Sequence, residues 1–132
     1  MHTLTIHDET ATGRVLHTIS LQFQEEYISV KDLIEARIRQ EIAHYEAKVD
    51  AAYLPSLVQP SKLESRLNAK GKNKKRAYID PEKQLYVALE AFQRNGFFIL
   101  IDDEQAEDLD QRFLVDDSTQ VSFIKLTPLV GG

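Results

Sequence analysis

The chain contains no cysteine. It therefore has no disulfide, no catalytic thiol and no thiolate metal ligand, and its redox compartment stays open. No apolar run reaches the roughly 18 residues that a membrane-spanning helix needs. Residues 1–8 also lack the basic start and apolar stretch of a signal peptide. These absences lead us to expect a cytoplasmic protein with no membrane segment.

The motifs of common active sites are absent as well. The sequence shows no Ser/His/Asp order, no phosphate-binding loop and no metal-binding helix motif. We therefore predict a protein that is not an enzyme and that holds no cofactor and no metal.

What is present is an ordinary globular composition with an uneven charge. The 132 residues, 42% hydrophobic and 28% charged, predict a single domain spanning residues 1–132. The net charge is −5, yet the segment Lys62–Arg76 holds seven Lys or Arg residues and one acid, Glu64. Residues 102–117 hold eight acids and one base. The chain thus contains one basic segment within an otherwise acidic sequence.

The N-terminal third predicts a β-hairpin followed by a helix. Apolar and polar residues alternate over Thr3–Asp8 and Val15–Phe23, with a turn signal at Thr12-Gly13 between them. Ser29-Val30-Lys31-Asp32 is a capping box in which serine and aspartate each satisfy an N–H group of the other. The helix that follows is expected to cover Val30–Val49.

The middle of the chain predicts two more helices. A second capping box begins at Pro60, and the short helix after it should end near Gly71. Asp80-Pro81 then supplies an N-cap and a proline at the first helical position, and Asn95-Gly96 should end that helix in left-handed fashion. Its apolar stripe is made of Leu85, Leu89 and Phe92.

Three strands are expected towards the C-terminus. Phe97–Ile101 is continuously apolar, which is typical of a central strand buried on both faces. Arg112–Val115 and Thr119–Leu126 are two further strands, and Asp102-Asp103-Glu104 is expected to turn the chain before them. The sequence then ends at Val130-Gly131-Gly132, a thin segment that can thread a narrow cleft.

Together these segments resemble the β-grasp fold of ubiquitin-like proteins. Thr12-Gly13-Arg14 lies where ubiquitin has Thr-Gly-Lys, and the Ile28–Ile34 segment lies where its helix starts. The segment from Phe98 to Ile101 leads to Gly131-Gly132 as ubiquitin's third strand leads to its tail. The resemblance covers roughly residues 1–45 and 96–132, and it implies an α+β fold with a mixed sheet packed on a helix.

The resemblance also implies a function. The chain looks like a bacterial ubiquitin-like modifier of an operon-encoded conjugation pathway, in which an E1-like enzyme adenylates the terminal carboxylate. An E2-like enzyme then passes it to an amine of a target protein, forming an isopeptide bond that a deconjugating peptidase can cleave. Gly132 would be the reacting residue, Gly131 would avoid a clash in the enzyme channel, and Leu129 and Val130 would anchor there.

Two departures from ubiquitin are plain. A helical insertion of about 50 residues, 46–95, replaces a brief loop, and the flexible tail 127–132 is apolar rather than basic. In the ubiquitin-like register Ile99 points inward, and Phe98 and Leu100 point outward. These two residues are either covered by the inserted helices or form a partner-binding patch. We expect coverage, because the apolar stripe of the inserted helix must be buried somewhere.

Three other features have competing interpretations. The basic loop is favoured as a solvated segment, although it could supply acceptor lysines or contact a phosphate backbone; no interleaved aromatic residue favours nucleic-acid binding. Its residues are Lys70, Lys72, Lys74, Lys75 and Arg76. His7 and His17 on the hairpin are favoured as surface histidines over a metal pair. Asp102-Asp103-Glu104 is a turn, although the same residues can hold a divalent cation.

Two alternatives to the modifier remain open. A sulfur-carrier β-grasp protein would use the same tail to form a C-terminal thiocarboxylate. A non-conjugated interaction domain would make no use of Gly131-Gly132 at all.

Overall fold

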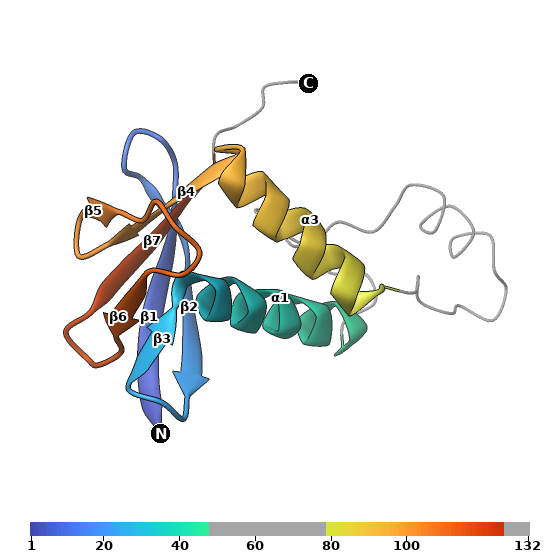
Figure 1. Cartoon of the computed structure of the whole chain (residues 1–132), viewed down its shortest axis with the longest axis horizontal. Helices are drawn as coiled ribbons and strands as arrows, with labels where there is room; N and C mark the ends of the chain where they lie inside the picture. Colours follow the sequence, from blue (N-terminus) through green and yellow to red (C-terminus); the bar gives the residue numbers. More distant parts are fainter. Residues whose placement is uncertain (48–78, 126–132) are drawn as a thin grey trace, which may run out of the picture.

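The structure, a computed structural model, describes residues 1–47 and 79–125. Within these ranges the chain is an α+β protein in which two helices lie on the same side of a mixed five-stranded sheet (Figure 1). The strand order is β2-β1-β7-β4-β5, and a separate two-stranded sheet joins β3 to β6. Neither helix in the described ranges is long and apolar enough to cross a membrane.

The N-terminal hairpin forms as predicted. β1 (His2–Glu9) and β2 (Val15–Phe23) pair antiparallel, and β2 stands at one edge of the sheet. Gly13 lies in the turn with a φ of 94°, a left-handed conformation that suits a residue without a side chain. Its N–H donates to the Thr10 carbonyl at 2.9 Å, which closes the turn.

The central strand of the sheet is β7 (Gln120–Lys125). It pairs in parallel with β1 and antiparallel with β4 (Phe97–Ile101), so the last described strand runs beside the first. Buried and half-buried residues alternate along β4, and Ile99 has no exposed surface. The predicted register, with Ile99 inward and Leu100 outward, is confirmed by this alternation.

Three short strands complete the sheets. β5 (Glu104–Gln105) follows a two-residue turn in which Asp102 and Asp103 both adopt positive φ, which lets the chain reverse onto β4. β3 (Tyr27–Ser29) pairs with β6 (Arg112–Leu114). Sequence analysis identified β6 but missed β3 and β5, because two or three residues are too few to show alternation.

Helix α1 (Val30–Ala47) begins at the predicted capping box. The Ser29 N–H donates to Asp32 Oδ2 and the Asp32 N–H donates to Ser29 Oγ, both at 3.1 Å. Its apolar stripe, which includes Leu33, Ile34 and Ile38, is buried against the sheet. This packing is the centre of the hydrophobic core.

Helix α3 (Pro81–Gln93) has the predicted ends. Asp80 Oδ1 accepts the Glu82 N–H at 3.1 Å, which caps the start of the helix. Asn95 adopts a φ of 64°, and the Gly96 N–H donates back to the Ala91 carbonyl at 2.7 Å. The left-handed end predicted for this helix is therefore confirmed.

The expected coverage of the outer sheet face by α3 is not met. Ala88 and Phe92 of α3 are buried in the same core as α1, and the Phe92 ring lies 5.9 Å from the Phe97 ring. Phe97 belongs to the inward-facing set of β4. The apolar stripe of α3 therefore lies on the inner side of the sheet, away from Phe98 and Leu100. The helix buries its apolar face by packing beside α1 (Figure 1).

Some sequence predictions fall on residues that the structure leaves undescribed. These are the short helix from Pro60 to Gly71, the end of the first helix at Val49, and the last residue of the final strand, Leu126.

Candidate functional site

The residues predicted to react or to form the basic loop lie outside the described ranges. They are Leu129, Val130, Gly131 and Gly132 in the tail, and Lys70, Lys72, Lys74, Lys75 and Arg76 in the loop. The structure does describe the strand from which the tail continues and the two faces of the sheet around it. Those surroundings form the candidate site.

The last described residue before the tail, Lys125, has its side chain on the inner face of the central strand. Lys125, the last residue of β7, is opposite Phe97 of β4 in the ladder. It shares its face of the sheet with Val121 and Phe123, because every second residue of a strand points the same way. Lys125 is half-buried there, whereas Phe123 is buried.

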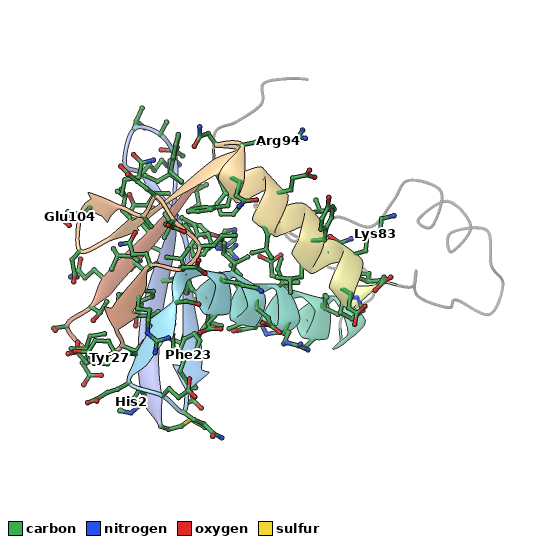
Figure 2. All side chains as sticks on the ribbon, in the orientation of Figure 1. His2, Phe23, Tyr27, Lys83, Arg94 and Glu104 are labelled. Atoms are coloured by element: carbon green, nitrogen blue, oxygen red, sulfur yellow. The ribbon has the colours of Figure 1, made fainter. Side chains whose placement is uncertain are left out.

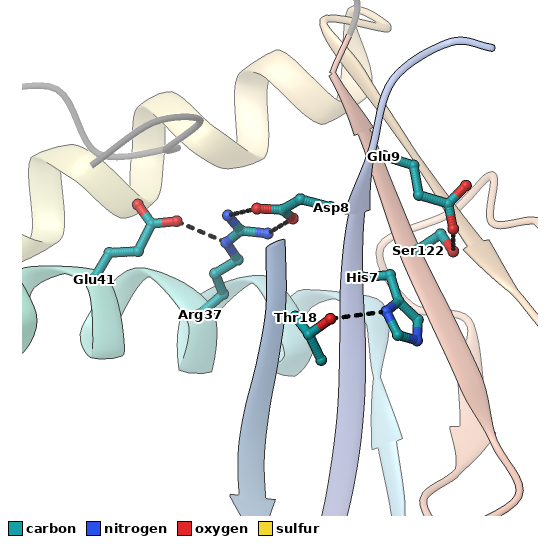
Figure 3. A network of polar contacts seen from close by, with 7 residues as sticks. All are labelled: His7, Asp8, Glu9, Thr18, Arg37, Glu41 and Ser122. Atoms are coloured by element: carbon teal, nitrogen blue, oxygen red, sulfur yellow. Dashed lines mark hydrogen bonds and ion pairs between the residues drawn. The ribbon is translucent and has the colours of Figure 1, made fainter. Parts of the chain in front are cut away.

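A buried ionic network lies on this inner face. Arg37 of α1 donates two hydrogen bonds to the carboxylate of Asp8 on β1, one from Nη1 to Oδ1 and one from Nη2 to Oδ2 at 2.7 Å. Its Nε donates to Glu41 Oε2 at 2.6 Å (Figure 3). The side chains of all three residues are at most 9% exposed. The guanidinium also lies 4.8 Å from the centre of the Phe123 ring.

Local structure explains why these groups meet. Asp8 follows Leu4 and Ile6 at every second position of β1, so its side chain points to the inner face. Glu41 lies one turn beyond Arg37 on α1, within reach of the same guanidinium. The network thereby links the first strand, the first helix and, through Phe123, the central strand.

Burial and charge act against each other in this network. Burial disfavours the charged guanidinium, but the hydrogen bond to Asp8 and the nearby Glu41 carboxylate outweigh it, so the pKa of Arg37 is raised. Burial also lowers the pKa of Lys125, while Glu41 and Asp8 oppose that effect and Arg37 adds to it. Lys125 is therefore coupled electrostatically to the network at the point where the tail begins.

The opposite face of the sheet carries a small apolar surface, which we name the outer patch: Phe98, Leu100 and Ile124. Phe98 is directly opposite Ile124 in the antiparallel ladder, so the two side chains lie on the same face. All three residues are half-buried. Sequence analysis had identified Phe98 and Leu100 as a candidate partner patch, and the structure adds Ile124 beside them.

Polar side chains border the outer patch. Ser122 Oγ donates to Glu9 Oε2 at 2.6 Å, and Thr18 Oγ1 lies 3.3 Å from His7 Nδ1 (Figure 3). These contacts cross from β7 to β1 and from β1 to β2, so they hold the polar groups in place. An apolar centre with an ordered polar border is the usual composition of a protein-binding surface.

The metal interpretations find no support in the geometry. Asp8 and His17 are opposite each other in the ladder, as are His7 and Thr18, so the two histidines point to opposite faces. Asp102 Oδ1 accepts the Gln120 N–H at 2.9 Å, which makes it part of the turn. In residues 1–47 and 79–125, no three His, Cys, Asp or Glu side chains are grouped so that they could hold a metal ion.

The buried network is the feature that sequence reasoning missed. One signal was present: Arg37 interrupts the apolar positions Leu33, Ile34 and Ile38 of the helix, and Asp8 occupies an inward position of β1. Each alone is compatible with a solvated charge. Only their approach across the core identifies them as partners.

Comparisons with protein-family models, with curated proteins and with solved structures gave no match.

Proposed function

We propose that this chain is a ubiquitin-like protein modifier with a β-grasp fold, acting in a bacterial, cytoplasmic conjugation pathway. An E1-like enzyme would activate the carboxylate of Gly132. An E2-like enzyme would transfer it to a target amine to form an isopeptide bond, which a deconjugating peptidase would cleave. The chain is the substrate of this chemistry and contributes no catalytic group.

One observation carries the proposal. The strand that leads towards Gly131-Gly132 is central in the sheet and parallel to the N-terminal strand, with an antiparallel hairpin on one side. Helix α1, which follows the hairpin and precedes the later strands in the sequence, packs on the inner face of the sheet. This arrangement is the one expected for a β-grasp protein whose tail extends from the sheet.

The length of the tail suits presentation to an enzyme. Seven residues, 126–132, separate Lys125 from the end of the sequence. An extended chain spans up to about 3.6 Å per residue, so Gly132 can lie roughly 25 Å beyond the sheet. The carboxylate can then enter an enzyme cleft while the folded part stays outside.

The outer patch suits recognition by the same enzymes. Ile124 precedes Lys125 directly on β7, and Phe98 is opposite Ile124 on β4. A partner holding these side chains would therefore stand close to the tail as well. Phe98→Ser should weaken activation without unfolding the protein, because Phe98 is not part of the buried core.

The decisive experiment is co-expression with the enzymes encoded by neighbouring genes, followed by mass spectrometry of the products. We expect an adduct through Gly132. Deleting Gly132 withdraws the carboxylate by up to about 3.6 Å and should abolish both adenylate and conjugate, while leaving the fold intact. Gly131→Leu should act similarly by blocking entry to the channel.

A matched control adds one alanine after Gly132. This variant should conjugate only when a peptidase first removes the extra residue, so it separates a requirement for the exact end from general damage to the tail. Conjugation by the protein ending at Gly131 would refute the modifier proposal. A thiocarboxylate at Gly132 with no adduct would favour the sulfur carrier instead.

A further inference from the structure

A groove lies where the edge strand β2 ends beside the start of α1. It has a volume of about 250 Å³ and is lined by the last residue of β2, the residues that follow it and one side of the helix. Figure 2 shows Phe23 at the end of β2, near the start of α1. Small-molecule pockets usually measure roughly 300–1,000 Å³, so this groove has room for one long side chain rather than for a drug-sized ligand.

The floor of the groove is apolar. Phe23 and Ala36 are half-buried there, and Ile28 is buried beneath them. Phe23 shares the inward face of β2 with the buried Leu21, yet part of its side chain stays exposed to the groove. Covering this floor removes apolar surface from water, which favours an incoming side chain that contains methylene groups.

The rim of the groove is acidic. Glu25 comes from the segment after β2, whereas Asp32 and Glu35 come from α1, with one base, Arg39, beside them. Arg39 is already held by Glu35 through two hydrogen bonds of 2.7 and 3.2 Å. The side chain of Glu25 has no hydrogen bond or ion pair with any residue in the described ranges. The rim therefore has an excess of negative charge and a carboxylate that is available to a partner.

The two acids nearest the start of the helix are not equivalent. Asp32 Oδ2 accepts the Ser29 N–H in the capping box, which leaves Oδ1 available to a second donor. However, the positive end of the helix dipole opposes a cation beside Asp32. Glu25 lies outside the helix and does not share this position. We therefore expect Glu25 to attract a cation more strongly than Asp32.

An apolar floor with an acidic rim fits a side chain that has both methylene groups and a positive charge. Arginine fits better than lysine, because its planar guanidinium stacks on an aromatic ring such as Phe23 and can donate to more than one carboxylate. The basic segment of this chain follows the opposite end of α1 in the sequence, about 27 Å along the helix from the groove. That position favours a second protein as the source of the arginine.

We propose that this groove binds one arginine side chain of a partner protein. The methylene groups of the arginine cover Phe23 and Ala36, and its guanidinium donates to Glu25. The groove contains no residue of the tail or of the outer patch, so this inference is independent of the modifier proposal.

The first test titrates the full chain with short peptides and follows its backbone amide resonances by NMR. The probe is acetyl-Gly-Arg-Gly-amide. One matched peptide contains citrulline, which keeps the shape of arginine without its charge, and another contains lysine. We expect the arginine peptide to shift the resonances of Glu25 and Ala36 and to bind about threefold more tightly than either control. Equal binding of the citrulline peptide overturns the proposal, and equal binding of the lysine peptide overturns the assignment to arginine.

Charge variants locate the site. Glu25→Gln should weaken binding of the arginine peptide about threefold, and Asp32→Asn should weaken it less. Glu26→Gln is the matched control, because Glu26 is exposed and adjacent but is not among the residues that line the groove. Arg39→Met should bind the peptide more tightly than the parent, because it releases the carboxylate of Glu35. Equal losses for Glu25→Gln and Glu26→Gln would show that the peptide senses only the overall charge, which overturns the proposal.

A last variant identifies the source of the arginine. Arg66→Gln/Arg76→Gln removes both arginines from the basic segment Lys62–Arg76. We expect this variant to bind the arginine peptide as the parent does. Tighter binding would mean that the chain's own arginines compete for the groove, and the proposal of a partner protein would then be wrong.

Discussion

Replacing Arg37 tests the buried ionic network directly. Arg37→Met keeps much of the side-chain volume but leaves the carboxylates of Asp8 and Glu41 buried without their shared cation. Removing one partner of a buried ion pair costs about 3–5 kcal/mol, because the remaining charge keeps its desolvation penalty. We expect the free energy of unfolding to fall by that amount.

The same helix offers a matched control. Arg39 pairs with Glu35 at the same spacing of four residues, but its side chain is 68% exposed. Arg39→Met should therefore cost only about 0.3–0.5 kcal/mol, because water solvates both charges when the pair is absent. Urea unfolding followed by circular dichroism measures both variants on one scale, with the slope against urea showing whether the unfolded state has changed.

The triple replacement Asp8→Leu/Arg37→Met/Glu41→Leu completes the test. With the three ionic side chains replaced, half-buried Lys125 is the charge that remains beside their positions. Most of the lost stability should return, because apolar residues of similar volume replace buried ion pairs at little cost. If Arg37→Met were no more destabilising than Arg39→Met, the network would not be buried as described. If the triple variant were the least stable, the ionic network itself would be a net source of stability.

Three further outcomes follow from the structure. Ile99→Ala should cost about 2–5 kcal/mol by opening a cavity in the core, whereas Leu100→Ala on the outer face should cost much less; equal thermal shifts would contradict the strand register. Phe92→Ala should destabilise the whole domain in one cooperative transition, and a separate early transition for α3 would show that the helix is an appendage. Hydrogen bonds from Ser118 lower the pKa of Asp116 in the folded protein. The ionised carboxylate therefore stabilises the fold at a pH above its usual pKa of 3.8, and this stabilisation is lost as the pH falls through the lower pKa of the folded state. Asp116→Asn should thus differ from the parent in thermal stability at neutral pH and approach it in acid, and a difference independent of pH would refute this.

Local signals correctly predicted where the two described helices begin. The capping box at Ser29 and Asp32, and the Asp80-Pro81 start of α3, both form the hydrogen bonds expected of them. These interactions join residues two or three positions apart, so the sequence contains both partners of each contact. Predicting the inward position of Ile99 also needed the register suggested by the resemblance to ubiquitin-like proteins, because alternation alone does not say which face is buried.

Long-range packing determined the position of α3 and the contact between Asp8 and Arg37. The sequence shows that α3 has an apolar stripe, yet only the folded chain places that stripe beside α1 rather than over Phe98 and Leu100. Asp8 and Arg37 are 29 positions apart, and nothing local brings them together. The periodicity of apolar residues indicates which side chains are buried, because the tendency to be buried is a property of each side chain. The surface against which these side chains pack depends on how all the helices and strands are arranged around one core. Only the tertiary structure determines that arrangement.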